Sequence, residues 1–346
     1  MRGEVSNSSP SMGEVAKPKI VCYFSITKDW TKNLVGDTCE VVSLVSGQQD
    51  VHSYDPSADA LLKMDGADLY VMLGIDIEAF AKDIAAAFPD VPTVILRVDT
   101  TEDPINGVEP ITDPVWTFPD GTHPKNEHFW TSPRHAIKFC KRLAEGIKKY
   151  IAPLQDAAFN ATIDRNLNTY VSKLSAVLKE LRDYRNIEPV KSMKVCPFHP
   201  AFIYFFEELG VERVAVIEQQ PGGTVSASHL EEVDEKVDSS VIVVYHPQES
   251  EGKMLAEDVA RENGANVTWL TPLIPVDTPQ EIVSDFGSQI DTYLEMLAFN
   301  VYQLLHSAPP PAEVISGYSI SWLVLTIMFM SVIIIFRFNK NKNRCD

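Results

Sequence analysis

Three of the eight histidines stand in local contexts that can hold an imidazole ring in a fixed position. His52 precedes the turn-forming run Ser-Tyr-Asp-Pro, His128 precedes Phe-Trp-Thr-Ser-Pro, and His199 lies between Phe198 and Pro200. Three neutral imidazoles that converge on one point can bind a zinc ion and leave a fourth position for another ligand. The sequence therefore predicts a candidate zinc site built from His52, His128 and His199.

Each of these histidines, taken alone, also fits a purely structural role. The residues after His52 are typical of a helix start, because Asp55 can accept backbone hydrogen bonds and Pro56 suits the first helical turn. His128 and His199 likewise precede expected helix starts, where a packed histidine is common. Their shared setting favours a ligand site, because ligands in α/β domains bind where strands or loops meet helix N-termini.

The elements that must position the histidines alternate between short apolar strands and helices. In the first half, strands are expected at 20–26, 39–45, 69–73 and 93–97, with a helix at 77–87. In the second half, strands are expected at 193–196, 214–217, 241–245 and 267–270, with helices at 202–209, 227–237, 254–263 and 279–306. This alternation predicts βαβ units around parallel sheets.

Two further helices are expected between these halves. Residues 133–150 carry apolar side chains on one face, and residues 163–184 carry them at steps of three and four over a much longer stretch. The predicted fold class is therefore α/β, with two Rossmann-like lobes on parallel sheets joined by one long helix.

Composition limits the functional classes. A chain of 346 residues with 45% hydrophobic content is long enough for about two domains. The net charge of -18 repels phosphate groups, so nucleic acid is not an expected partner. The sequence contains no Cys-x-x-Cys motif, which disfavours a cysteine zinc site, and it leaves open a single disulfide between Cys22 and Cys39.

The C-terminal region predicts a membrane anchor. The run from Tyr318 to Phe336 is uncharged, and as a helix it would be about 28 Å long, close to the ~30 Å hydrocarbon core of a bilayer. A buried core helix is the alternative. Basic residues from Arg337 onward place the tail in the cytoplasm and the remainder of the chain outside. Residues 1–17 lack the apolar stretch of a signal peptide, so the route of export stays open.

These observations divide the chain into seven parts. We expect a polar N-terminal segment at 1–17, a first α/β lobe at 18–150, a bridging helix at 151–187 and a second α/β lobe at 188–307. A Pro-rich spacer at 308–317, a transmembrane helix at 318–338 and a basic cytoplasmic tail at 339–346 follow.

Five segments give the chain a family resemblance. They begin at Val51 (VHSYDPS), Ala67 (ADLYVMLGIDIE), Glu127 (EHFWTSP), Phe198 (FHPAFIYFF) and Tyr293 (YLEMLAFN). Together and in this order they resemble the zinc/manganese solute-binding proteins of ABC importers (cluster A-I), over roughly residues 18–306. The resemblance implies two lobes bridged by a rigid helix, with the metal ion in the cleft between them.

The resemblance also implies a set of metal ligands. His52 and His128 would come from the first lobe and His199 from the second, and a third imidazole favours Zn²⁺ over Mn²⁺. Many family members offer an Asp as fourth ligand, whereas Thr271 or Pro272 stands there in this chain. Water is the first candidate for the fourth position, and Asp277 or an acidic residue of the loop at 99–127 is the second.

Nearby carboxylates are expected to orient the imidazoles and to fix their tautomers. The candidates are Asp55, Glu127 and Glu218.

The predicted function is that of a membrane-anchored, extracytoplasmic monomer that captures Zn²⁺, with Mn²⁺ as second candidate, and delivers it to an ABC permease. No reaction is expected to be catalysed. A zinc-dependent hydrolase with a three-histidine site is one alternative, because three imidazoles and an activated water also form catalytic zinc sites. A surface adhesin or metal chaperone with the same fold is the other.

Overall fold

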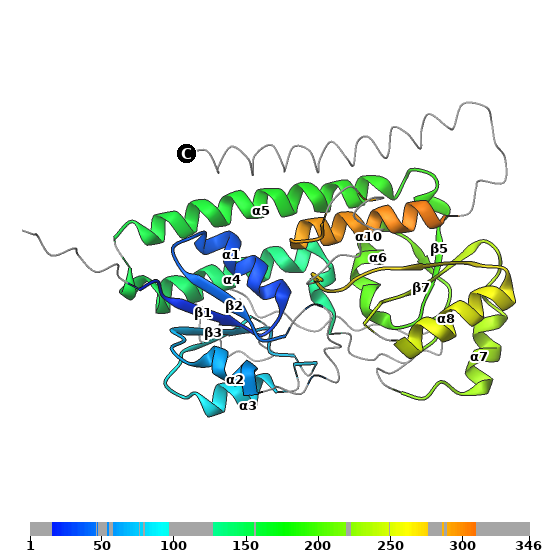
Figure 1. Cartoon of the computed structure of the whole chain (residues 1–346). Helices are drawn as coiled ribbons and strands as arrows, with labels where there is room; N and C mark the ends of the chain where they lie inside the picture. The colour runs from blue at the N-terminus through cyan, green and yellow to red at the C-terminus, as the bar shows by residue number, and fades with distance from the viewer. Residues whose placement is uncertain are drawn as a thin grey trace, which may run out of the picture.

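The structure is a computed structural model, and it describes most of the chain between residues 16 and 308. The described residues are 16–45, 47, 54, 58–75, 77–78, 80–96, 127–155, 157–218, 223–248, 250–275, 286 and 289–308. Within them, two α/β lobes lie side by side, each built on a four-stranded parallel sheet (Figure 1). The predicted α/β class with two parallel-sheet lobes is confirmed.

The first lobe contains the sheet β2-β1-β3-β4. Its strands are β1 (Lys19–Cys22), β2 (Glu40–Ser43), β3 (Leu69–Met72) and β4 (Thr93–Ile95), and its helices are α1 (Ser25–Val35), α2 (Ala58–Met64) and α3 (Ala81–Ala87). All four residues of β3 are buried, which is typical of a parallel strand covered on both faces.

The second lobe repeats the same strand order, as the sheet β6-β5-β7-β8. Its strands are β5 (Lys194–Pro197), β6 (Glu212–Arg213), β7 (Val241–Tyr245) and β8 (Asn266–Trp269), and its α-helices are α6 (Ile203–Leu209), α7 (Ala227–Asp234) and α8 (Ser250–Asn263). The short 3₁₀ helices η3 (Val190–Ser192) and η4 (Pro200–Phe202) flank β5. In both lobes the first strand therefore lies inside the sheet, between the second and the third.

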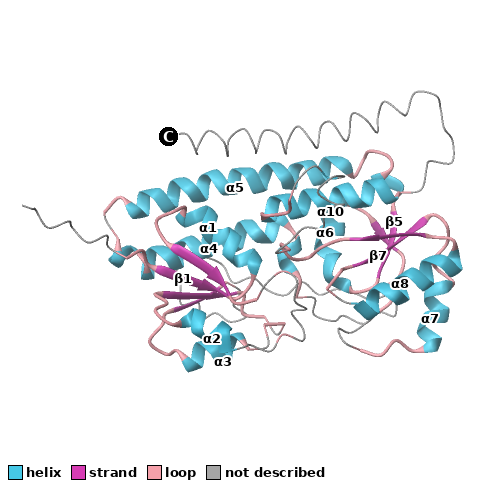
Figure 2. Cartoon of the chain, viewed as in Figure 1, coloured by secondary structure: helices cyan, strands magenta, loops and turns pink. Residues whose placement is uncertain are grey.

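A long helix connects the lobes, as predicted. Helix α4 (Pro133–Tyr150) follows the 3₁₀ helix η1 (Phe129–Thr131), and η2 (Ala152–Leu154) leads into α5 (Phe159–Tyr184). Helix α5 packs against α1 and α4 of the first lobe and α6 of the second, and Figure 2 shows it running along both lobes. Its buried stripe includes Ile163, Tyr170, Leu174 and Leu181. Helix α10 (Tyr293–Ser307) packs against β8 and α1.

Two predicted strands are wrong in extent. The strand expected at 20–26 ends at Cys22, and Ser25 already begins α1. The apolar run continues through this boundary because α1 buries Ile26, Trp30 and Leu34 on one face. The strand expected at 214–217 is also displaced, since β6 consists of Glu212–Arg213.

Cys22 and Cys39 are both buried and both free, so the disulfide considered between them is not formed. The sulfur of Cys22 lies 3.3 Å from the hydroxyl oxygen of Thr31 in α1. Burial raises the pKa of the Cys22 thiol to about 12. The thiol is therefore a neutral, buried part of the core.

The predicted transmembrane helix at 318–338 lies outside the described residues, as do residues 1–15 and the basic tail at 339–346. Among the helices that are described, none combines the length and the apolar character needed to cross a membrane.

Candidate metal centre

His128 lies at the start of η1 in the first lobe. Its side chain is buried, and its backbone carbonyl accepts hydrogen bonds from the amide (3.1 Å) and the hydroxyl (2.9 Å) of Thr131. The imidazole packs against the ring of Trp130, with 5.1 Å between the ring centroids. The position of this histidine therefore depends on a tight backbone turn and on an aromatic neighbour.

His199 follows β5 and precedes η4 in the second lobe, and its side chain is fully buried. Its Nδ1 lies 2.7 Å from Oε2 of Glu218, so Nδ1 carries the proton that the carboxylate accepts. This assigns the lone pair to Nε2, the nitrogen that a metal ion would use. Glu218 is thus one of the predicted orienting carboxylates that the structure places against an imidazole.

The other two predicted orienting carboxylates have different outcomes. Glu127 is buried and accepts a hydrogen bond from the amide of Ile77 (2.9 Å). Asp55 lies outside the described residues.

The two lobes bring His128 and His199 together although 71 residues separate them. Their Nε2 atoms are 3.3 Å apart, and their rings meet edge to face with centroids 4.9 Å apart. Two zinc–nitrogen bonds of about 2.05 Å at a tetrahedral angle place their nitrogens about 3.3 Å apart. The observed spacing is therefore that of two imidazoles able to share one metal ion.

The remaining predicted ligands, His52 and Asp277, lie outside the described residues. Within the described ranges, no three His, Cys, Asp or Glu side chains are already grouped in an arrangement that would hold a metal ion. The structure thus brings together two of the three predicted histidines.

Thr271 and Pro272 occupy the place where the resemblance implied a missing carboxylate. The Thr271 hydroxyl donates to the carbonyl of Leu273 (2.6 Å), and its amide donates to Oδ1 of Asn300 (2.9 Å). The carbonyl of Pro272 accepts a hydrogen bond from Nε1 of Trp130 (2.6 Å). Both residues therefore have structural partners, and the hydroxyl proton of Thr271 is directed into its own turn.

Loops of the two lobes touch beside the histidine pair. Besides the bond between Trp130 and Pro272, Nε2 of Gln248 donates to the carbonyl of Gly47 (2.9 Å). A Cβ atom on Gly47 would lie 1.6 Å from the carbonyl oxygen of Ile274. Glycine is required at position 47 because the backbones of the two lobes approach so closely there.

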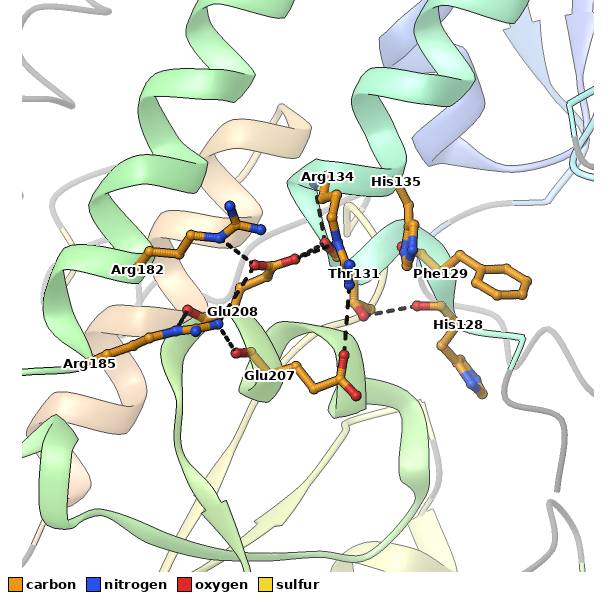
Figure 3. Close-up of polar contacts among 10 residues, drawn as sticks. His128, Phe129, Thr131, Arg134, His135, Arg182, Arg185, Glu207 and Glu208 are labelled. Atoms are coloured by element: carbon orange, nitrogen blue, oxygen red, sulfur yellow. Dashed lines mark hydrogen bonds and ion pairs between the residues drawn. The ribbon is translucent and has the colours of Figure 1, made fainter. Parts of the chain in front are cut away.

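A buried carboxylate fixes the start of α4 just after His128. Glu208 of α6 is 2% exposed, and its carboxylate accepts from the hydroxyl of Ser132 (3.0 Å) and pairs with Arg134 (2.9 Å) and Arg182 (2.9 Å). Arg185 donates to the backbone carbonyl of Glu208 (2.8 Å). Figure 3 shows these contacts converging on Glu208 next to the segment that carries His128. The cluster joins α4, α5 and α6.

His135, in the first turn of α4, is a buried histidine outside the pair. Its ring packs edge to face against Phe129 and Tyr204, and Nδ1 lies 3.2 Å from the carbonyl of Phe129. Burial lowers the pKa of His135 to about 4. The residue is therefore a neutral packing element at pH 7.

One buried histidine at this junction was missed in the sequence. His246 follows β7 directly, is 4% exposed, and packs edge to face against the ring of His199 with 5.4 Å between centroids. A signal was present, because His246-Pro247 follows an apolar strand just as His199-Pro200 does.

Comparison with known proteins identifies relatives of this chain. The zinc-binding lipoprotein AdcA of Streptococcus pneumoniae is 26% identical over 259 residues, 74% of this chain and 50% of AdcA. The chain thus spans about half the length of that relative. The iron-binding protein YfeA of Yersinia pestis is 24% identical over 257 residues, which cover 72% of this chain and 75% of YfeA.

A crystal structure of ZnuA has the same fold, with a TM-score of 0.63, 21% identity, and coverage of 84% of this chain and 99% of ZnuA. A family profile described as zinc-uptake complex component A, periplasmic (ZnuA) matches residues 20–306, well over half of the sequence. The matched range contains both lobes, the bridging helix and the histidine pair, and the chain therefore belongs to the ZnuA family.

Proposed function

We propose that this chain captures Zn²⁺ outside the cytoplasm and delivers it to an ABC permease. The observation that supports this most directly is the 3.3 Å separation between Nε2 of His128 and Nε2 of His199. One imidazole comes from each lobe, so a metal ion bound by both would hold the lobes together. Membership in a family described by zinc uptake supports the same cargo.

We propose His52 as the third ligand, from the sequence pattern around it. The described residue nearest to it, Tyr54, is buried and packs against Tyr23 of the first lobe, with 6.1 Å between ring centroids. Its hydroxyl donates to the carbonyl of Leu44 (3.5 Å), just beyond the carboxyl end of β2. Ligands of open α/β sheets bind at these strand ends, which supports a ligand in the same loop.

The donor type favours zinc. Imidazole nitrogen suits Zn²⁺, whereas Mn²⁺ prefers oxygen donors such as carboxylate and water. The names of the relatives differ in this respect, since AdcA is called zinc-binding and YfeA iron-binding. Mn²⁺ is the second candidate from the sequence resemblance, the name of YfeA adds iron to the metals to be tested, and competition among the three metal ions is the appropriate assay.

We propose that the chain acts as a monomer tethered to the membrane by residues 318–338, with 308–317 as spacer. The support is the uncharged run from Tyr318 to Phe336 and the basic residues after it. The tether would keep the metal-binding lobes at a high effective concentration near the permease. Full-length protein should stay with membranes during carbonate extraction, and a chain ending at residue 308 should not. Release of the full-length protein would contradict the tether.

The sequence leaves open two alternative functions, a zinc-dependent hydrolase and a surface adhesin or metal chaperone. Their support is limited to the fold. The family that the chain belongs to is described as an uptake component, which weighs against a hydrolase. An adhesin or chaperone would bind metal without a permease, and the presence of permease and ATPase genes beside this gene would distinguish the two cases.

Calorimetric titration with Zn²⁺ tests metal capture. His199→Ala should lose more than about 100-fold in zinc affinity, since even the loss of a partner outside the ligand set costs roughly 10- to 100-fold. His229→Gln is the matched control, because His229 lies in the same lobe, is partly exposed, and contacts the carbonyl of Val216 (2.9 Å). Unchanged affinity in His199→Ala would contradict the proposed function.

A further inference from the structure

Strands β5 and β7 are neighbours in the second sheet, and a His-Pro pair follows each of them, after Phe198 in the case of β5 and directly in the case of β7. The two strands pair in parallel with Pro197 opposite Val244. The pairing continues beyond that point, because the amide of Phe198 donates to the carbonyl of Val244 (2.6 Å). His199 lies two residues after Pro197, and His246 lies two residues after Val244. The parallel register therefore delivers two histidines to the same end of the sheet at matching positions.

The rings of these two histidines are in contact and enclosed by protein. His199 is 1% exposed and His246 is 4% exposed. Their centroids are 5.4 Å apart at an interplanar angle of 81°, and the His128 ring contacts His199 at 4.9 Å and 80°. The imidazoles of His128 and His246, which come from separate segments, thus both contact the imidazole of His199.

Zinc bound by His128 and His199 requires further ligands, because zinc sites are almost always tetrahedral. Among the described side chains that contact the pair, Trp130 has no lone pair to offer, and the carboxylate of Glu218 is engaged by Nδ1 of His199. The hydroxyl of Thr271 donates to Leu273 within its own turn. His246 is a described neighbour that carries imidazole nitrogens and whose ring contacts His199.

From this geometry we infer that His246 is an additional ligand of the bound metal ion and that it biases the site toward Zn²⁺ over Mn²⁺. The inference rests on the metal capture proposed above and adds a residue that the predicted ligand set did not contain. Among the described residues no three His, Cys, Asp or Glu side chains are yet grouped to hold a metal ion, so binding requires His246 to turn about its side-chain torsions between staggered rotamers.

Selectivity follows from the donor set. A site of nitrogen donors favours zinc, and replacing one imidazole by a carboxylate shifts preference toward metals that prefer oxygen. The identity of residue 246 therefore determines how strongly this chain discriminates between Zn²⁺ and Mn²⁺.

The test uses three variants of the full chain and two measurements. Zn²⁺ and Mn²⁺ affinities are measured by competition for wild type, His246→Gln, His246→Glu and the His229→Gln control. His246→Gln should lower zinc affinity by more than about 100-fold, since the loss of a partner outside the ligand set already costs roughly 10- to 100-fold. His246→Glu should raise manganese affinity relative to zinc affinity, and His229→Gln should match wild type. Circular dichroism verifies that each variant is folded.

X-ray absorption of the zinc-loaded wild type and of zinc-loaded His246→Gln counts the imidazoles around the metal ion directly. One imidazole fewer in His246→Gln than in the wild type supports the inference, and an equal number overturns it. Zinc affinity that stays at the wild-type value in His246→Gln also overturns it. In that case loss of binding in His199→Ala would leave the proposed function intact, whereas unchanged binding in both variants would remove the proposed function as well.

Discussion

The two lobes have the same strand order, yet they hold their histidines by different means. In the first lobe, His128 is positioned by the backbone turn of η1 and by the Trp130 ring. The Nε1 of Trp130 donates a hydrogen bond to the carbonyl of Pro272 in the second lobe. The hydroxyl of Tyr293 in α10 donates to the backbone carbonyl of Trp130 (2.5 Å). Packing across the junction therefore sets the position of this histidine.

In the second lobe, a charged partner orients the histidine. The carboxylate of Glu218 accepts from Nδ1 of His199, and the amide of Glu218 donates to the carbonyl of Phe198 (2.7 Å). The contrast implies that mutations on the first-lobe side should affect stability and binding together. Mutations on the second-lobe side should affect binding with little change in stability.

The largest effect is expected at Trp130, which is fully buried. Trp130→Ala should destabilise the fold by about 4 kcal/mol, because it removes a large core side chain and leaves a cavity. Zinc affinity should fall as well, since the His128 ring loses its aromatic neighbour. Urea denaturation and zinc titration measure the two effects.

Trp130→Phe is the matched control for this variant. It retains an aromatic ring but lacks the N–H that bonds Pro272, so a smaller loss of stability is expected. Equal stability of Trp130→Ala and wild type would contradict the role assigned to packing.

Glu208 comes next, because it connects both lobes with α5. Glu208→Gln should cost about 2 kcal/mol of stability, less than for a fully buried pair because the three arginines are partly exposed. Glu207→Gln is the natural control, since Glu207 is 56% exposed and lies 3.8 Å from Arg134. Thermal denaturation measures the stability of both variants. Similar losses of stability would show that the burial of Glu208 does not strengthen its ion pairs.

Glu218→Gln addresses the second-lobe side directly. Removing the charge weakens the bond that fixes the His199 tautomer, so zinc affinity should fall by roughly 10- to 100-fold. Stability without metal should change by less than about 1 kcal/mol, because the amide oxygen can still accept the hydrogen bond. If stability falls as much as in Trp130→Ala, the contrast between the lobes is wrong.

The smallest expected effect is a pH dependence of the stability of the fold, caused by His135 in the first lobe. Burial lowers the pKa of His135 to about 4, below its ordinary value of 6.5. The stability that neutral His135 contributes is therefore complete above pH 6.5 and is lost as the pH falls toward 4. Between pH 6.5 and pH 5 the loss should be about 1.5 kcal/mol, measured by urea denaturation.

His135→Phe should lack this part of the acid destabilisation while keeping a ring against Phe129 and Tyr204. Glu78 acts in the opposite direction, since burial raises its pKa to about 7 and the folded protein favours its protonated form. That contribution is present in both proteins and cancels in the comparison. Identical pH profiles for variant and wild type would contradict the role of His135.

Much of the local structure was predictable from neighbouring residues. Helix α4 begins and ends at the predicted residues, Pro133 and Tyr150, because Ser132 caps it, proline starts it and one face is apolar. Strand β7 also has its predicted bounds, Val241 and Tyr245. Helix α1 was missed, because the apolar run from β1 continues past Ser25 and hides the change from strand to helix.

The candidate site was also predictable only in part. The sequence by itself identified His128 and His199 as residues at helix starts and Glu218 as a carboxylate able to orient an imidazole. Only the tertiary structure decided that His128 and His199 face each other, because α5 and the loops around Trp130 and Gly47 set how the lobes meet. It also added His246 beside His199, since the register of two parallel strands is a contact between residues far apart in the chain.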